Sequence, residues 1–246
     1  MSRVIVLSLL AAAGAVFGPQ ASAQTFNAQQ QSEIRAIVRD YLVHNPDVLR
    51  EALDELQTRV TAERVARAEN DPRDFSMGAR DAPITIVEFF DYRCPYCMAT
   101  LPWVNDVIRT RRDVRFVFKE MPIFELHGTP AVEASRASIA AMPQGRYYQF
   151  HRALMSFTGD LTSARIDQLA RQSGIDVARM RREMEDPAII ELLQDNAALA
   201  TDLAGQLATP TFVINGQIVH GANTRELDRR LREAARDARE RREAAR

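Results

Sequence analysis

Apolar residues recur at helical spacing along the chain after residue 25. Ile34 and Val38 begin one apolar stripe, which ends where Asn45 precedes Pro46. A residue before proline avoids the helical region, so the first helix should end there. Pro46 suits the first position of a second helix, with Asn45 as its cap. The pattern therefore predicts two consecutive helices over 26–70.

The second of these helices carries a coiled-coil-like seam. Leu49, Leu53, Leu56 and Val60 follow one another at intervals of four, three and four residues. Such spacing is typical of helices that pair along one face. Two heptads also fit an amphipathic helix that packs on its own domain. We expect the seam to serve self-association of the segment 24–70.

The pattern changes after the polar stretch 70–74, which is predicted to be a hinge. Residues 84–90 form an unbroken run of β-branched and aromatic residues, which is typical of a strand buried on both faces. A helix is predicted from residue 94 to about 112, and a second buried strand over 114–118. From about 128 to 207 the pattern is helical throughout. This order predicts an α/β fold with a helical insertion.

A hairpin follows the insertion. The strands 211–214 and 217–220 flank Asn215 and Gly216, and Asn-Gly favours the positive φ values of a tight type I′ turn. Thr224 is predicted to cap a final, arginine-rich helix.

Composition narrows the classes of partner. The chain has 246 residues, of which 46% are hydrophobic and 26% charged, with a formal net charge of −1. This composition is typical of a globular protein with a substantial core. The near-neutral charge gives no reason to expect nucleic acid or an anionic membrane surface as a partner.

The first 23 residues are typical of a secretory signal. Arg3 precedes an apolar run over 4–17, and Ala21-Ser22-Ala23 fits the small-x-small cleavage rule. The apolar run is short for a membrane span, which needs about 20 residues. We therefore expect cleavage after residue 23 and export to the periplasm, where disulfides persist.

The chain has two cysteines, Cys94 and Cys97, in a CxxC motif that follows a predicted buried strand and opens a helix. A helix N-terminus favours a thiolate, so Cys94 is predicted to be an exposed nucleophile and Cys97 a shielded resolving thiol. Half of a zinc site is the alternative, but structural zinc needs four ligands. We therefore expect no metal site and no cofactor beyond the redox-active pair. The four histidines are not spaced as metal ligands would be; they are His44, His127, His151 and His220.

Two further positions are candidate parts of this site. Glu88 lies in the buried strand six residues before Cys94, where a carboxyl group with a raised pKa could accept the Cys97 proton; it could instead point outward. Thr209 precedes Pro210 at the entrance of the hairpin. We expect a cis peptide bond there, which leaves backbone groups of Thr209 available to an extended substrate.

These motifs together resemble a known family. The segments 88–97 and 208–216 look like the two signature regions of DsbA-like exported disulfide oxidoreductases, which elaborate the thioredoxin fold, and the resemblance covers roughly 75–235. The segments 37–42 and 45–49 resemble the N-terminal part of the ScsC and Com1-like branch. In some members this part forms an oligomer, and such oligomers act as disulfide isomerases.

The resemblance implies a division of the chain. A signal peptide spans 1–23, and a helical oligomerisation segment spans 24–70. A DsbA-like thioredoxin domain spans 71–246, with the helical insertion at about 128–207.

The resemblance also assigns roles. Cys94 is the attacking and Cys97 the resolving cysteine, Glu88 is the buried acid, and Pro210 is the cis-proline. One departure concerns Tyr96, because DsbA oxidases carry Pro-His between the cysteines. The implied partners are envelope proteins with thiols or disulfides, a membrane redox partner of the DsbB or DsbD/ScsB type, and further copies of the chain. The residues expected to meet substrate are Pro95, Tyr96, Thr209 and Pro210.

The residues leave two other functions open. The dithiol could hold copper or zinc in a periplasmic metal-handling protein, since thiolates are soft ligands. The helices could instead grip client proteins, as in a holdase, with the dithiol incidental. The leading hypothesis remains an exported thiol:disulfide interchange protein that forms, reduces or isomerises disulfides.

Overall fold

The computed structural model describes residues 26–123 and 130–246. The predicted signal peptide and the residues 124–129, where the insertion was expected to begin, lie outside this part. The chain divides into two compact units at Asp54 and Glu55. None of the helices in the described part is long and apolar enough to cross a membrane.

The first unit contains α1 (Ala28–His44) and the start of α2 (Pro46–Asn70), which confirms the two predicted helices. Asn27 caps α1, because its side chain accepts from the Gln30 backbone N–H while the Gln30 side chain accepts from the Asn27 backbone N–H. The expectation that Asn45 caps α2 was wrong. Its side-chain amide donates instead to the Tyr41 carbonyl at 2.8 Å, so it closes α1.

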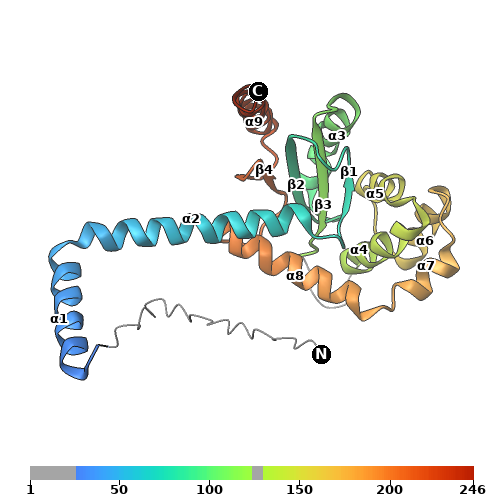
Figure 1. Ribbon diagram of the computed structural model, residues 1–246. Coiled ribbons are helices and arrows are strands. Elements are labelled where there is room, and N and C mark those ends of the chain that lie inside the picture. The colour runs from blue at the N-terminus through green and yellow to red at the C-terminus, as the bar shows by residue number, and fades with distance from the viewer. Residues whose placement is uncertain (1–25, 124–129) are drawn as a thin grey trace, which may run out of the picture. The chain divides into compact units, whose positions relative to one another are not determined.

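The second unit is built on a five-stranded sheet in the order β1-β3-β2-β4-β5 (Figure 1). β2 and β3 run parallel, and the other neighbouring pairs are antiparallel. This arrangement confirms the α/β thioredoxin fold expected from the sequence. The strands are β1 (Phe75–Met77), β2 (Ile84–Phe90), β3 (Val114–Glu120), β4 (Thr211–Ile214) and β5 (Gln217–His220).

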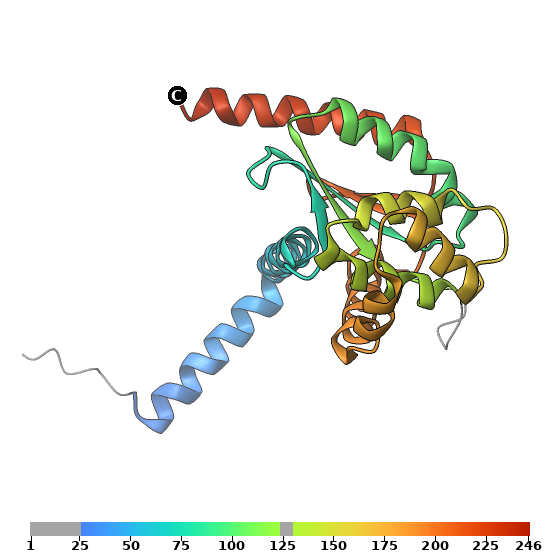
Figure 2. The same cartoon turned by 90° about the vertical axis from the view of Figure 1, so that its right-hand side faces the viewer.

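Helices cover both faces of the sheet. In the turned view of Figure 2, α9 in red and α3 in green lie on one side of the sheet and α8 in orange on the other. The helical stretch that interrupts the fold between β3 and β4 is the predicted insertion. The helices after α2 are α3 (Pro95–Thr110), α4 (Pro130–Ala141), the 3-10 helix η1 (Met142–Gln144), α5 (Tyr147–Met155), α6 (Ser163–Gln172), α7 (Val177–Glu183), α8 (Pro187–Ala204) and α9 (Thr224–Ala244).

Alternate residues of the central strands pack into two separate cores. Ile86, Phe116 and Phe212 belong to the core that contains buried residues of α3, α9 and the insertion. Val87 and Val117 point to the opposite face, because successive side chains of a strand alternate. There they pack against α8 and the C-terminal part of α2. The second half of α2 is therefore part of the thioredoxin core.

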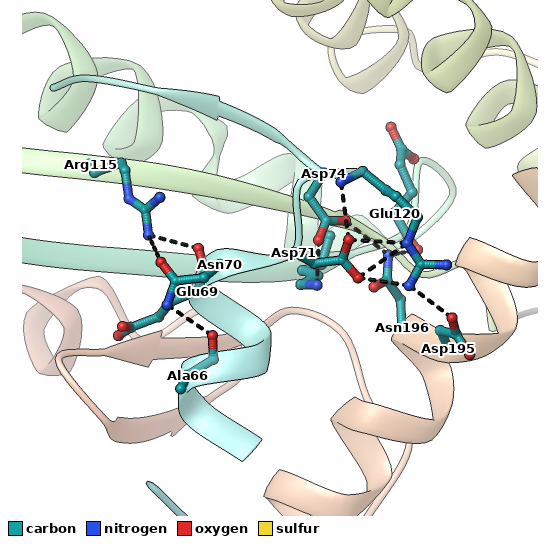
Figure 3. A network of polar contacts seen from close by, with 11 residues as sticks. Ala66, Glu69, Asn70, Asp71, Asp74, Arg115, Glu120, Asp195 and Asn196 are labelled. Atoms are coloured by element: carbon teal, nitrogen blue, oxygen red, sulfur yellow. Dashed lines mark hydrogen bonds and ion pairs between the residues drawn. The ribbon is translucent and has the colours of Figure 1, made fainter. Parts of the chain in front are cut away.

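The last turn of α2 is bound to β3 (Figure 3). The guanidinium of Arg115 donates to the Glu69 carbonyl at 2.7 Å and to the Asn70 side chain at 3.1 Å. These bonds satisfy backbone and side-chain acceptors at a helix C-terminus, where carbonyls lack partners within the helix. Ala68, in the same turn of the helix, is fully buried against the sheet.

The prediction of a hinge at the polar stretch 70–74 was wrong, because this stretch belongs to the second unit. Arg73 pairs with Asp71 and, at 2.8 Å, with Asp195 of α8. Asp74 pairs with Lys119, the only lysine of the chain, and both side chains are almost completely buried. Both charged pairs fix this stretch on the second unit, and the division of the chain falls inside α2.

The structure departs from the predicted elements at β1, at the end of β3 and at the cap of α9. The short edge strand β1 was missed, and β3 continues two residues beyond the predicted end, to Glu120. The cap of α9 is Asn223 rather than Thr224, since the Asn223 side chain accepts from the Glu226 backbone N–H. The hairpin is confirmed, with φ values of 48° at Asn215 and 82° at Gly216.

Candidate functional site: a buried dithiol at the start of α3

Cys94 lies where β2 passes into α3. It is the N-cap residue of this helix, and Pro95 occupies the first helical position. Both cysteines are free thiols. The prediction of an exposed Cys94 was wrong in this state: only 2% of its surface is accessible. The Cys94 sulfur donates to the Thr209 carbonyl at 3.3 Å, so the loop before β4 covers it.

The surroundings of Cys94 favour its thiolate. A hydrogen bond from the Cys97 thiol is the largest cause that lowers the pKa of Cys94, to about 6. Burial opposes this effect, while Thr209 and the backbone N–H groups of Cys97 and Tyr96 add to it. Free N–H groups at a helix N-terminus stabilise a negative charge in the same way. The sequence prediction of a stabilised thiolate therefore has a geometric basis.

Cys97 has the opposite environment. It lies one turn further along α3 and exposes 1% of its surface, as predicted for the shielded member of the pair. Burial is the largest cause that raises its pKa far above that of an ordinary thiol, and Cys94 and Glu88 raise it further. The two thiols therefore differ sharply in acidity, and at neutral pH only Cys94 loses its proton.

Glu88 points into the core rather than outward. It lies in β2 opposite Phe118 and Phe212, and 2% of its surface is accessible. Thr100 of α3 donates to its carboxyl group at 3.4 Å. Burial raises the pKa of Glu88 to about 8, although this hydrogen bond opposes the shift. Its carboxyl group can therefore hold or release a proton near neutral pH.

The loop before β4 forms the other side of the site. The Thr209–Pro210 peptide bond is cis, as predicted. The Pro210 carbonyl accepts from the Gly221 backbone N–H, which ties the loop to the end of β5. The Thr209 hydroxyl is buried and has no hydrogen-bond partner. It lies close enough to Cys94 to help lower the pKa of that thiol.

Both residues between the cysteines face solvent. Tyr96 exposes 66% of its surface, whereas most large apolar side chains of the second unit are buried. Pro95 beside it is also exposed. The structure therefore brings six of the seven predicted site residues to one place around the sulfur atoms, with Glu88 beneath them.

Sequence reasoning missed a buried polar cluster behind this site. Glu120, the last residue of β3, accepts from the hydroxyls of Tyr92 and Tyr147, each at 2.8 Å. Burial raises the pKa of Glu120 to about 8. The available signal was Glu120 itself, an acidic residue two positions after the predicted strand 114–118. The other members of the cluster are Ser138 and His151.

The described residues offer no further group of donors for a metal. Among residues 26–123 and 130–246, no three His, Cys, Asp or Glu side chains lie together in a metal-binding arrangement. His151 is enclosed in the aromatic core, where burial lowers its pKa to about 3.

Comparison with known proteins agrees with this geometry. Residues 70–231 match the family described as Thioredoxin, and residues 30–63 match the family described as Copper resistance protein ScsC N-terminal domain. The chain belongs to the thioredoxin family. Within it, the chain is a DsbA-like thioredoxin-fold protein of the ScsC branch.

Two solved structures illustrate the similarity. A linker-deletion mutant of ScsC from Proteus mirabilis is 30% identical, with a TM-score of 0.65, and covers 88% of this chain and 100% of its own. A thioredoxin-like oxidoreductase from Silicibacter pomeroyi DSS-3 is 34% identical, with a TM-score of 0.63. It covers 71% of this chain and 97% of its own.

A third relative has a different domain arrangement. The Na(+)/H(+) antiporter NhaA 1 of Salinispora arenicola is 32% identical over 151 residues, which are 61% of this chain. The chain spans 23% of that protein's length, so the match concerns one part of a longer protein.

Proposed function

We propose that this protein is an exported thiol:disulfide interchange protein that acts through Cys94 and Cys97. One observation carries the proposal: an acidic thiol touches a second thiol that is buried and far less acidic. Reactive cysteines are those whose thiolate is stabilised at neutral pH, whereas structural buried cysteines are inert. The similar thioredoxin-like oxidoreductase from Silicibacter pomeroyi supports this function.

The reaction proceeds by two exchanges. The Cys94 thiolate attacks one sulfur of a substrate disulfide, the substrate S–S bond breaks, and one substrate thiolate leaves. Cys97 then gives up its proton and attacks the Cys94 sulfur, which releases the second substrate thiolate. Two electrons pass from the dithiol to the substrate, and Cys94 and Cys97 end as a disulfide. The reverse sequence oxidises a substrate dithiol, and release before the second step allows isomerisation.

The loop and turn around the sulfur atoms form the proposed substrate surface. Pro95 and the exposed Tyr96 flank Cys94 on one side, and Thr209 and Pro210 flank it on the other. An extended substrate that pairs with the Thr209 backbone displaces the Cys94 contact to the Thr209 carbonyl and uncovers the sulfur. The buried state of Cys94 therefore belongs to the substrate-free protein.

The proposed setting is the periplasm. A similar protein from Salmonella enterica serovar Typhimurium is described as a periplasmic thioredoxin-like protein and is 25% identical. In this compartment the substrates are envelope proteins with thiols or disulfides, and a membrane protein of the DsbB or DsbD/ScsB type resets the dithiol.

The first unit is proposed to join copies of the chain. Large apolar side chains of α1 and α2 are exposed, and an apolar groove runs between α1 and the start of α2. Several exposed apolar side chains that lie together point to a partner surface. The seam residues Leu49, Leu53 and Leu56 expose 46%, 64% and 55% of their surfaces.

Glu88 is proposed to accept the Cys97 proton in the second exchange. Substituting Glu88→Gln should slow the release of glutathione from a Cys94–glutathione mixed disulfide at least about tenfold, because the amide cannot take up a proton. Alkylation of Cys94 should stay near the wild-type rate, since that step does not need Glu88. An unchanged release rate means that the carboxyl group is not the acceptor.

The same substitution should stabilise the protein at pH 7. The pKa of Glu88 is higher in the folded than in the unfolded chain, so folding takes up a proton between about pH 4.5 and 8 and stability falls as pH rises through this range. Glutamine removes this loss of stability. One pKa unit corresponds to about 1.36 kcal/mol, so the gain in the free energy of unfolding is up to about 3 kcal/mol at pH 7. Thermal unfolding of both proteins at pH 4.5 and 7 measures it.

Trapping of mixed disulfides tests the proposed function directly. In the exported Cys97→Ser variant the first exchange proceeds and the second cannot, so covalent adducts with envelope proteins should accumulate on nonreducing gels. The matched Cys94→Ser variant should give none, because its remaining thiol is buried and weakly acidic. Absence of adducts in both variants contradicts exchange.

A further inference from the structure

The turn between β2 and α3 is held by the residues at the end of β3. Asp91 and Tyr92 belong to this turn, and both are fully buried although only Arg93 separates them from the CxxC motif. Three hydrogen bonds connect the two segments. Tyr92 donates to Glu120 at 2.8 Å, the Ile123 backbone N–H donates to Asp91 at 2.9 Å, and the Met121 backbone N–H donates to the Phe90 carbonyl at 2.9 Å.

The hydroxyl of Tyr92 also reaches the helical insertion. It lies 2.9 Å from the Ser138 hydroxyl of α4 and 3.2 Å from Nδ1 of His151 in α5. Glu120, on the other side, accepts from Tyr92 and from Tyr147 of α5 through the same oxygen. One hydroxyl therefore joins the active-site turn, the end of β3 and two helices of the insertion.

The Tyr92 hydroxyl has three partners among the described residues. It donates to Glu120 and lies within hydrogen-bond distance of the Ser138 hydroxyl and of Nδ1 of His151. Burial lowers the pKa of His151 to about 3, so its ring is neutral. Removing the Tyr92 hydroxyl therefore leaves buried polar groups unpaired.

The position of the turn controls the contacts that Cys94 receives. One residue, Arg93, separates Tyr92 from Cys94, and the Cys94 backbone N–H donates to the Asp91 carbonyl at 3.1 Å. The Cys97 thiol, the Tyr96 backbone N–H and the nearby Thr209 each help to lower the pKa of Cys94. Hydrogen bonds weaken steeply with poor geometry, so a small shift of the turn changes the stability of the thiolate.

We propose that the Tyr92 hydroxyl positions the CxxC turn for exchange by tying it to Glu120 and to the helical insertion. Tyr92 acts through the turn and touches neither substrate nor sulfur. This inference rests on the proposed function, because it assigns a residue that tunes the same dithiol. It also gives the insertion a role in the chemistry of the site, since α4 and α5 supply two of the three partners of the hydroxyl.

Two matched variants of the full-length chain test the proposal. Tyr92→Phe and Tyr147→Phe each remove one hydroxyl that donates to the same oxygen of Glu120, but only Tyr92 lies in the active-site turn. The thiolate absorbance of the reduced proteins is titrated, and the dithiol is equilibrated with glutathione. We expect Tyr92→Phe to raise the Cys94 midpoint by about one unit, a tenfold change in the ionisation constant, and to make the pair less oxidising. Tyr147→Phe should keep the wild-type midpoint.

Thermal unfolding separates positioning from general loosening. Both variants should lose stability, because each leaves buried groups unpaired. A wild-type midpoint in Tyr92→Phe overturns the proposal, and so does an equal shift in both variants. If Tyr92→Phe does not fold, Ser138→Ala removes one partner of the Tyr92 hydroxyl, and a midpoint unchanged there overturns the proposal. The titration needs no turnover, so failure of the proposed function, seen as wild-type protein that exchanges no disulfides, is a separate result.

Discussion

A chain that starts at Asp71 should unfold at a temperature about 6–20 °C below that of a chain that starts at Glu55. The second half of α2 covers one face of the sheet, and Ala68 within it is fully buried. Removing it also takes away the carbonyl and amide that bind Arg115. Loss of this packing and of buried hydrogen bonds should lower the free energy of unfolding by about 3–5 kcal/mol. Each kcal/mol lowers the unfolding temperature by about 2–4 °C.

Circular dichroism on heating compares the two truncated chains under reducing conditions. A matched pair of point variants in the same helix provides the control. Ala68→Asp should lower the unfolding temperature strongly, because it buries a charge, whereas Ala66→Asp, at an exposed position of the same helix, should leave it near the wild-type value. Equal unfolding temperatures for the chains starting at Glu55 and Asp71 contradict the assignment of α2 to the core.

The rate at which reduced protein attacks a small neutral disulfide should fall tenfold per pH unit below about pH 6 and level off above pH 7. The pKa of Cys94 is lowered to about 6, whereas an ordinary thiol ionises near 9. At pH 7 about nine-tenths of the Cys94 thiol is ionised, against about 1% of an ordinary thiol. Initial rates between pH 5 and 9 give the profile, and Cys94→Ser should show no attack across this range.

A rate that keeps rising tenfold per pH unit up to pH 9 contradicts a stabilised thiolate.

The lowered pKa of Cys94 also predicts how the stability of the reduced protein depends on pH. Between about pH 6 and 9 the unfolded chain keeps the Cys94 proton that the folded chain has lost, so this group makes the folded state more stable as pH rises. Glu88 acts in the opposite direction between about pH 4.5 and 8.

Elements determined by local chemistry could be predicted from the sequence. The β-branched run Ile84–Phe90 became β2 with the predicted bounds, and Asn215-Gly216 formed the expected turn. The CxxC motif at a helix start and the cis bond before Pro210 were also recognisable, because short segments carry their signals. The shielding of Cys97 and the burial of Glu88 followed from strand and helix periodicity.

Features that depend on contacts between distant segments could not be predicted. The seam pattern of α2 fades after Val60, so nothing local showed that its polar last turns bind Arg115 across the sheet. Asp71, Arg73 and Asp74 are typical of a loop in sequence, but their partners come from β3 and α8. The burial of Cys94 arises from Thr209, which lies 115 residues away along the chain.

The cluster around Glu120 shows the same limit for the site. Its members come from β3, the CxxC turn and the insertion, and each is unremarkable alone. His151 in particular was one of four scattered histidines, yet the fold encloses it against Tyr92 and Phe90. Buried polar groups must find partners, so an acidic residue that ends an apolar strand is a usable signal for such a cluster.

Titration of the thiolate absorbance in the reduced wild-type protein tests the central claim most directly. The account predicts that one thiolate appears with a midpoint near pH 6, because Cys97 and the helix N-terminus stabilise Cys94, and that the second thiol stays protonated up to pH 9. Two thiols that ionise together near pH 9 contradict it, since neither is then poised to attack a disulfide at neutral pH.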